Sequence, residues 1–266
     1  MKTDYSLSVV VTTHMRQEKV ISAIRSVARI SLVREIVVVD DASPNLTSEW
    51  CDLVCSLDAR IKLVCLKQNV GIPGARNSGL NIITSSHVMF LDDDDQLVSH
   101  GVRRMWRSVK RFPGSPCVGI VLVEKIGKIR HFRLPASTHK GEIWGLDSKR
   151  FNGSHFSWAV KQSSILPVDL IRKLGGFDCQ FRTRQWTDLY FQISKEVKVR
   201  RVFWPVYRLN RDLSSSRLTA QLQQRKLSME LLLAKHHDLL HENPKRTNTL
   251  VKNHKEMLER TKQGNI

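Results

Sequence analysis

Four consecutive acids, Asp92 to Asp95, directly follow the apolar run Val88–Leu91. An apolar run of this length between polar residues is typical of a strand that is buried on both faces. The acids then lie at the carboxyl end of that strand, where open α/β sheets bind their ligands. Four adjacent carboxylates raise one another's pKa values unless a cation neutralises them. The pattern therefore favours a Mg²⁺ or Mn²⁺ site shared with substrate phosphates, and a solvated acidic turn is the alternative.

The first half of the chain alternates two kinds of hydrophobic pattern. Runs of β-branched residues predict strands, and segments with apolar residues at helical spacing separate them. Repeated β-α-β units predict a parallel sheet with helices on both faces and right-handed crossovers. We expect strands over 7–13, 35–39, 61–66 and 87–91, and helices over 17–30, 45–57 (capped by Asn45 or Thr47) and 73–84.

The pattern changes after the acids. Residues 98–111 predict a basic amphipathic helix, and 117–123 and 128–134 predict two strands joined at Ile126-Gly127. A binding loop is expected over 135–156, a short helix over 167–174 ended by two glycines, and a basic helical segment over 217–263 broken at Pro244. We divide the chain into 1–115, 116–212 and a basic helical C-terminal extension, 213–266.

Composition narrows the possible partners. The 266-residue chain has a formal net charge of +18, which favours polyanions such as nucleic acid, an anionic membrane or phosphorylated substrates. Its five cysteines lack metal-ligand spacing and predict a reduced, cytoplasmic protein. No stretch approaches the roughly 20 apolar residues of a membrane-spanning helix, and the first residues show no signal-peptide pattern.

Five short segments stand out by their order and spacing: Ser8–Arg16, Glu35–Ser43, Asn69–Gly79, Phe90–Asp95 and Leu174–Asp178. Together they resemble the family 2 inverting glycosyltransferases of GT-A fold. The resemblance is dense over residues 6–100 and looser over 160–193. It implies an α/β, Rossmann-like GT-A fold with a doubly wound, mostly parallel sheet, a smaller mixed acceptor region and a helical C-terminal tail. Within this fold, residues 1–115 would bind the nucleotide sugar, and residues 116–212 would bind the acceptor and carry the catalytic base.

The resemblance also implies roles for the donor site. Thr12 and Asp41 would contact the nucleotide base, with Asp40 as the neighbouring candidate. A plain turn with helix capping is the alternative for both acids. Arg76 would bind phosphate at the start of a helix, where backbone N–H groups favour anions. Asp92, Asp93 and Asp94 match the DXD motif, in which Asp92 lies near the ribose, Asp93 joins the nucleotide-sugar site, and Asp94 ligates Mn²⁺ or Mg²⁺.

The catalytic base is the weakest match. The family places a carboxylate after the Gly-Gly-Phe-Asp segment, but Trp186 occupies that position here. We expect Asp188 to take the role through a local shift. The alternative is an acid that fixes the helix after it, or a protein of low activity. Asp178 more simply organises the turn after Phe177.

The resemblance implies transfer of a sugar, with inversion, from a nucleotide-sugar donor (a UDP-sugar) to a glycan or lipid-linked saccharide acceptor in bacterial envelope polysaccharide synthesis. The basic helix and the C-terminal tail would contact anionic lipid at the cytoplasmic face of the inner membrane. A catalytically weakened binding module, a nucleotidyltransferase and a basic nucleic-acid-binding protein are the alternatives. No nucleic-acid-binding motif is present in the sequence, so we expect no nucleic acid partner. Trp144, His155 and Trp158 are candidates for a sugar platform.

Overall fold

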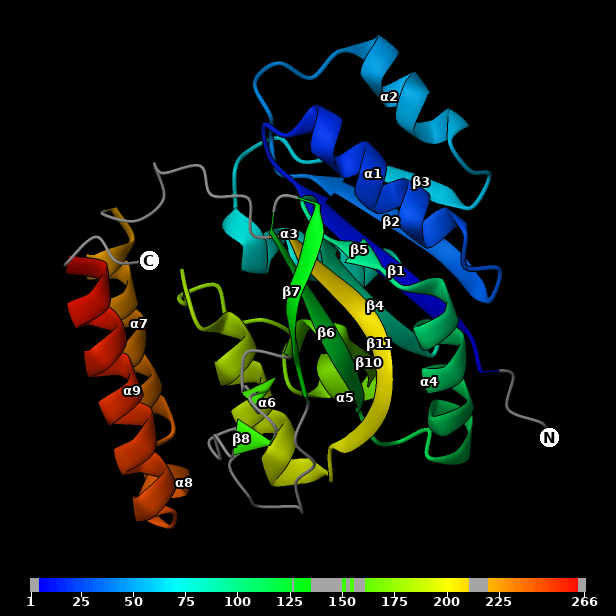
Figure 1. The fold of residues 1–266 in the computed structure, drawn as a ribbon. Helices are drawn as coiled ribbons and strands as arrows, with labels where there is room; N and C mark the ends of the chain where they lie inside the picture. The colour runs from blue at the N-terminus through cyan, green and yellow to red at the C-terminus, as the bar shows by residue number, and fades with distance from the viewer. Residues whose placement is uncertain are drawn as a thin grey trace.

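The computed structural model describes residues 5–125, 127–134, 150–151, 154–155, 161–210 and 220–262. One large mixed sheet runs through the molecule, helices pack on it, and a group of C-terminal helices lies to one side (Figure 1). The predicted α/β fold is therefore present. Trp144 and Trp158, and the side chain of His155, lie outside what the structure describes.

The predicted N-terminal alternation of strands and helices is confirmed. The parallel strands β1 (Leu7–Thr13), β2 (Val33–Asp40), β3 (Ile61–Cys65) and β4 (His87–Asp92) lie in the order β3-β2-β1-β4. The helices between them are α1 (Gln17–Ala28), α2 (Ser48–Ser56) and α3 (Gly71–Ile82). Thr47 is the cap of α2, since its hydroxyl accepts a hydrogen bond of 3.2 Å from the Trp50 amide.

Strand register brings the polar strand ends together. Thr12 on β1 pairs with Asp92 on β4, and Thr13 pairs with Asp40 on β2. Every residue of β1 is buried, because the strand lies between two neighbours and under helices. The polar residues of three separate segments therefore meet at one edge of the sheet.

The sheet continues with strands of mixed direction. Beyond β4 come β10 (Ser164–Pro167), β6 (Cys117–Lys125), β11 (Arg200–Asn210) and β5 (Gln96–Leu97), and β7 (Lys128–Arg133) pairs with β6. The predicted β6–β7 hairpin is confirmed. The sequence analysis missed β5, β10 and β11. Two of them are very short, and β11 contains Pro205 among basic residues, which obscures the alternation of a strand.

Four helical and two short strand elements complete this part: α4 (Ser99–Arg111), α5 (Val168–Lys173), α6 (Gln185–Glu196), the 3₁₀ turn Lys161–Ser163, β8 (Arg150–Phe151) and β9 (Ser154–His155). Helix α4 packs directly on β11, because a Cβ at Gly101 would lie 1.6 Å from the Pro205 carbonyl oxygen. The predicted end of α5 is confirmed. Gly175 and Gly176 have φ values of +82° and +76°, a conformation that glycine adopts readily.

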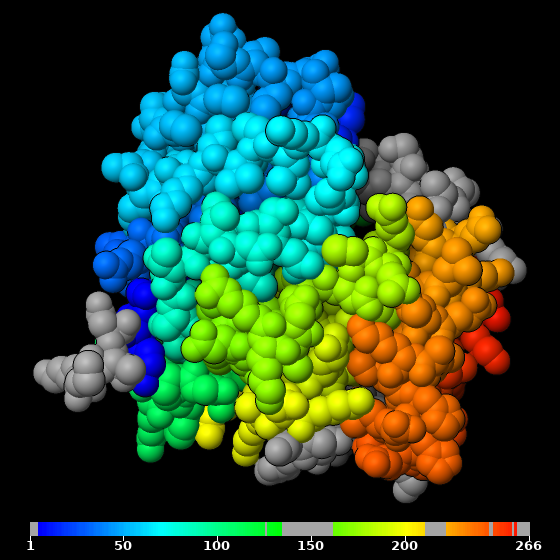
Figure 2. Space-filling view, turned by 180° about the vertical axis from the view of Figure 1, so that it is seen from behind, coloured from blue at the N-terminus to red at the C-terminus, as the bar shows by residue number. Residues whose placement is uncertain are grey.

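The C-terminal extension comprises α7 (Ala220–Lys235), α8 (His237–His241) and α9 (Pro244–Lys262). The predicted break at Pro244 is confirmed, because α8 ends at His241 and Pro244 is the first residue of α9. Figure 2 shows the orange extension packed against the yellow-green segment before it. Their contact is a second apolar cluster that joins Phe181 and Phe191 to leucines and Met229 of the extension.

All five cysteines are free thiols. Among the described helices, none combines the length and the apolar character needed to cross a bilayer.

Candidate active site

A pocket of about 500 Å³ opens at the edge where β1, β2 and β4 end. It brings together Thr12, Asp41 and the first three acids of the run, as the sequence predicted. Asp40, Arg76 and Asp188 do not line it. Its walls are Thr12, Thr13, His14, Arg16, Asp41, Asn69, Gly71, Ile72, Pro73, Ala75, Asp92, Asp93, Asp94, Arg182 and Gln224.

The two acids after β2 have different surroundings. Both oxygens of Asp40 accept hydrogen bonds from Ser43, from its amide at 2.7 Å and from its hydroxyl at 2.6 Å. Asp40 is therefore engaged in the turn, as the structural alternative for this residue expected. Asp41 accepts a hydrogen bond of 2.7 Å from the Val70 amide through Oδ1 and faces the pocket. Asp41 is the better placed of the two to meet a ligand.

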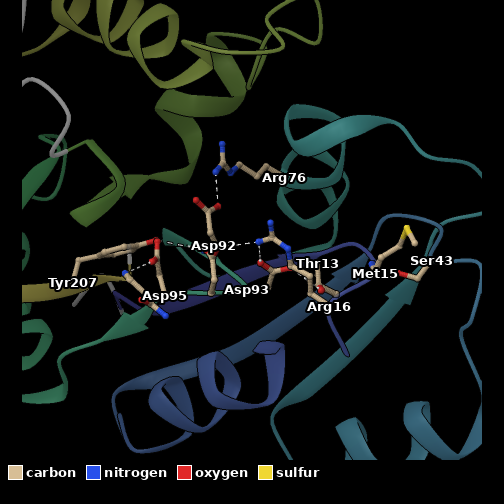
Figure 3. A network of polar contacts seen from close by, with 11 residues as sticks. Thr13, Met15, Arg16, Ser43, Arg76, Asp92, Asp93, Asp95 and Tyr207 are labelled. Carbon is tan, nitrogen blue, oxygen red and sulfur yellow. Dashed lines mark hydrogen bonds and ion pairs between the residues drawn. The ribbon is translucent and has the colours of Figure 1, made fainter. Parts of the chain in front are cut away.

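The acidic run is held by side chains from three elements (Figure 3). Arg76 on α3 donates to Asp92 Oδ1 at 2.6 Å. Arg16 bridges the next two acids, with Nη1 2.8 Å from Asp93 Oδ1 and 2.9 Å from Asp94 Oδ2. Thr13 donates to Asp93 Oδ2 at 2.9 Å. Two arginines thus partly neutralise three carboxylates at the pocket wall.

Burial raises the pKa values of Asp93 and Asp94, and the neighbouring carboxylates add to this effect. Burial by itself would lower the pKa of the Arg16 guanidinium, but Asp93 and Asp94 outweigh it and raise that pKa. The sequence analysis gave Arg16 no role. Its only signal was a basic residue just after β1, because the contact joins segments far apart in the chain.

Asp95 points away from the pocket. Its carboxylate accepts hydrogen bonds of 2.8 Å from the Tyr207 hydroxyl and from the Asn210 amide, both at the end of β11. Burial, with the charges of Asp92 and Asp94, raises the pKa of Asp95 to about 8. The fourth acid therefore ties the run to β11.

Arg76 packs against two neighbouring aromatic rings. Its Cζ is 5.2 Å from the ring centroids of both Phe177 and Trp186, and its side chain is only 2% exposed. Within the described part of the chain, its Nε and Nη1 have no hydrogen-bond partner. Trp186, which stands where the family places its base, thus forms part of the wall that fixes Arg76 and, through it, Asp92.

Asp188 lies inside the protein rather than on the pocket wall. It is in the first turn of α6, is fully buried, and accepts from Gln192 Nε2 at 3.0 Å. Two residues of the extension contact its Oδ1, Lys235 Nζ at 3.0 Å and His236 Nε2 at 2.8 Å. Lys235 also pairs with Asp178 at 2.7 Å. In this arrangement the predicted base is enclosed by the C-terminal extension.

The residues on the pocket wall suit a divalent cation by their chemistry. Asp92 and Asp94 bring hard carboxylate oxygens to the pocket, and Mg²⁺ commonly combines one or two carboxylates with substrate phosphates and water. Among the described residues, no group of three or more His, Cys, Asp or Glu is arranged as a complete metal site. Metal binding at Asp94 would require exchange of its contact with Arg16.

Comparison with known proteins identifies relatives of this chain. A model of the family described as Glycosyl transferase family 2 matches residues 8–164. The GalNAc(5)-diNAcBac-PP-undecaprenol beta-1,3-glucosyltransferase of Campylobacter jejuni is 29% identical over 203 residues, 74% of this chain and 65% of that protein. Glycosyltransferase GlyA of Streptococcus pneumoniae is 34% identical over 85 residues, 32% of this chain and 12% of that protein. The chain therefore spans less than two thirds of both relatives.

Solved structures show the same fold. TarS 1-349 of S. aureus in complex with UDP-GlcNAc has a TM-score of 0.63 and 17% identity, over 88% of this chain and 67% of that one. The full TarS structure gives a TM-score of 0.65 over 93% of this chain and 42% of that one. This likeness confirms the expected GT-A fold.

Proposed function

The chain belongs to glycosyl transferase family 2, and we propose that it moves a sugar from a nucleotide-sugar donor to a glycan or lipid-linked saccharide acceptor. The observation that carries the proposal is the pocket at the carboxyl edge of β1, β2 and β4. Thr12, Asp41 and Asp92 to Asp94 all face it. Ligands of α/β sheets bind at this edge, and its 500 Å³ lies in the usual range for a small-molecule site.

The proposed donor is a UDP-sugar. Asp41 presents a carboxylate to the pocket, and an ionised carboxylate only accepts hydrogen bonds, so it suits an N–H of the base. Thr12 pairs with Asp92 on the neighbouring strand, so the two residues lie side by side at the pocket, which suits contacts to the base and ribose of one ligand. The relation to the UDP-GlcNAc complex of TarS supports a uridine nucleotide.

We propose that Asp94, with Asp92 beside it, holds Mg²⁺ or Mn²⁺. When bound, such an ion would stabilise the charge that develops on the departing diphosphate. Arg16 and Arg76 act on the same carboxylates. Arg76 fixes the position of Asp92, and Arg16 balances the charge of Asp93 and Asp94.

Inversion requires a base that removes a proton from the acceptor hydroxyl. We propose Asp188 for this role. Its carboxylate is fully buried against Lys235 and His236, so it can accept a proton from the acceptor only after these two residues release it. The same observation favours a second candidate function. A protein whose Asp188 stays enclosed would bind the donor and transfer its sugar slowly or not at all.

The proposed acceptor is a saccharide linked to a lipid, in bacterial envelope glycan synthesis. The relative from C. jejuni, which is named for an undecaprenol-linked saccharide, supports this class. Such an acceptor would place the protein in the cytoplasm at the inner membrane.

Thermal unfolding with UDP-sugars and other nucleotides, each with and without Mn²⁺, tests the donor site. A ligand that binds only the folded state raises the melting temperature. We expect uridine nucleotides to give the largest rise, Mn²⁺ to increase it, and Asp94→Asn to abolish the metal-dependent part. A matched control, Glu196→Gln on exposed α6 surface, should respond as the wild type does. Failure of every nucleotide to stabilise the wild type would contradict the proposal.

Transfer assays separate the two candidate functions. Product formation that falls strongly in Asp188→Asn, while nucleotide stabilisation persists, supports Asp188 as base. Undetectable transfer in the wild type with every lipid-linked acceptor, alongside clear nucleotide binding, supports the binding module.

A further inference from the structure

Helix α4 and the first half of β11 form a surface that we call the basic–aromatic face. No acid occurs in residues 99–111 or 197–210. The face comprises Arg103, Arg104, Arg107, Lys110 and Arg111 on α4, and Arg201, Phe203 and Trp204 on β11. Figure 1 shows the two elements side by side at one edge of the molecule.

The two elements contact each other along their lengths. Trp204 lies 5.7 Å from the His100 ring and 4.8 Å from Arg104 Cζ, near the start of α4. At the other end of α4, Arg200 Cζ lies 3.4 Å from the Phe112 ring centroid. Beside Trp204, Gly101 allows the helix to touch the Pro205 backbone. Packing therefore holds Trp204 against α4, and Arg201 and Phe203 lie next to it along β11.

Two large aromatic side chains are exposed on this face. Phe203 is 58% exposed and Trp204 is 40% exposed. The apolar side of α4 is not available, because Val102, Met105 and Val109 are buried against the sheet. The apolar contribution to the face thus comes from β11, and α4 contributes the positive charge. A basic surface that only faces water does not need exposed aromatic rings beside its charges. The rings therefore indicate a binding surface.

The positive charges of the face are not balanced by ion pairs. Among the described residues, no carboxylate lies within ion-pair distance of any of its arginines or of Lys110, whereas Arg60, Lys62 and Lys235 each have an acidic partner. Arg103 donates instead to the neutral Ser99 hydroxyl. The face therefore complements an anionic surface.

We propose that the basic–aromatic face docks on an anionic lipid bilayer. Phe203 and Trp204 enter the boundary between headgroups and acyl chains, and the cations of α4 and Arg201 contact lipid phosphates. Exposed aromatic residues beside Arg and Lys are the combination that binds membrane interfaces. The inference deepens the proposed function by naming a partner, since a lipid-linked acceptor lies on such a surface.

The rings favour lipid over nucleic acid. Single-stranded nucleic acid binds by stacking bases on free aromatic faces. Here Arg104 covers the Trp204 ring, and Arg201 Cζ lies 5.0 Å from the Phe203 ring centroid. Rings with a guanidinium over one face offer less area for bases, but their apolar edges can still enter a bilayer.

Vesicle flotation tests the docking. The wild type should float with vesicles that contain phosphatidylglycerol and stay in solution with phosphatidylcholine alone. Arg107→Gln with Lys110→Gln should lower the partition coefficient by about thirtyfold, at about fivefold for each charge lost near the membrane. Phe203→Gln should lower it by about tenfold, through loss of a buried apolar ring.

Matched controls lie elsewhere on the surface. Arg25→Gln with Lys67→Gln removes the same charge from α1 and from the segment after β3, and Phe132→Gln removes an exposed ring from β7. Both should leave flotation nearly unchanged. Equal losses in face and control variants would overturn the proposal, as would vesicle binding that ignores lipid charge, or binding to DNA or RNA without binding to anionic vesicles.

Nucleotide-dependent stabilisation of each variant shows whether the protein remains folded and its donor site intact. A face variant that keeps this stabilisation but no longer floats supports the docking surface by itself. If the wild type floats but no nucleotide stabilises it, the docking surface stands and the proposed transferase function fails.

Discussion

Two clusters of acids in this chain are built differently. At the end of β4, Asp92, Asp93 and Asp94 face a pocket, and Arg16 and Arg76 balance them incompletely. At the contact between α6 and the extension, Asp178 and Asp188 meet Lys235 and His236, and Asp188 has no exposed surface. The first cluster keeps excess negative charge next to solvent, whereas the second is enclosed with its partners.

This difference shows that an aspartate can either meet a ligand or stabilise the fold, according to its surroundings. Carboxylates that remain underbalanced at a pocket attract a further cation or a hydrogen-bond donor. Carboxylates enclosed with cations join parts of the fold, and loss of one member leaves a buried charge without a partner. Accessibility and local charge balance, more than residue type, indicate which cluster meets substrate.

The largest expected effect comes from Asp188→Ala. It leaves His236 and Lys235 without their buried partner and should cost about 3–5 kcal/mol of unfolding free energy. We expect the melting temperature to fall by about 10 °C, since about 1 kcal/mol corresponds to 2–4 °C in a protein of this size. A variant that melts like the wild type but loses transfer would contradict the structural role given to Asp188, because Asp188 would then act on substrate.

Glu35 tests whether a buried carboxylate with several hydrogen-bond donors also stabilises the fold in another part of the protein. Burial alone would raise its pKa, but hydrogen bonds from Lys62, Ser8 and Thr84 outweigh it and lower the pKa to about 2. Glu35→Gln should cost roughly 2 kcal/mol at neutral pH, the range for hydrogen bonds to a charged group.

The pH dependence of that difference follows from the sign of the shift. A carboxyl with a lowered folded-state pKa stabilises above its ordinary value of 4.5, and this contribution is lost as pH falls toward about 2. Urea unfolding of both proteins between pH 7 and pH 3 should therefore show the gap narrowing. A gap that is constant over this range would contradict the assigned contacts.

Arg16→Gln tests the acidic cluster at the pocket, Asp92 to Asp94. Removing the guanidinium from Asp93 and Asp94 takes away a competitor for added cations, so Mn²⁺ should bind about tenfold more tightly without nucleotide. Titration calorimetry measures this directly. Lys19→Gln is the matched control, because Lys19 acts on Asp94 only through its charge and should change the affinity less. Equal or weaker Mn²⁺ binding in Arg16→Gln would show that the arginine does not compete.

The smallest expected effect concerns an acid that is neither enclosed nor at the pocket. Glu196 pairs with Lys173 at 2.7 Å on the surface, with 38% and 65% of their side chains exposed. Glu196→Gln should change the unfolding free energy by less than about 0.5 kcal/mol, as usual for exposed ion pairs. A loss comparable to that of Asp188→Ala would refute the role given to burial.

The sequence predicted the N-terminal half well because its signals are local. Apolar runs and helical spacing over residues 7–91 identified β1 to β4 and the helices between them. The second half depends on distant pairings. Strand β11 contains Pro205 and exposed arginines, and it becomes a strand by pairing with β6. Local pattern does not reveal such a partner.

The same contrast between local signals and distant contacts applies to the candidate site. The strand pattern and the family resemblance together placed Thr12, Asp41 and Asp92 to Asp94 at one sheet edge. The enclosure of Asp188 was out of reach, since Lys235 at the end of α7 and His236 after it are distant in the chain and no spacing rule links them to Asp188. Arg16 was visible as a residue but not as a partner, because the geometry that brings it to Asp93 and Asp94 exists only in the folded chain.

Gln224 on α7 shares the pocket wall with residues of the sheet edge, although α7 belongs to a segment with its own apolar cluster. Substitutions in the extension can therefore accumulate independently of substitutions in the strands. Changes in the extension can reshape one rim of the pocket while the strands that hold Asp41 and Asp92 keep their pairing. Related proteins can thus differ in the part of the ligand that this rim contacts and still hold the rest of the ligand in the same way.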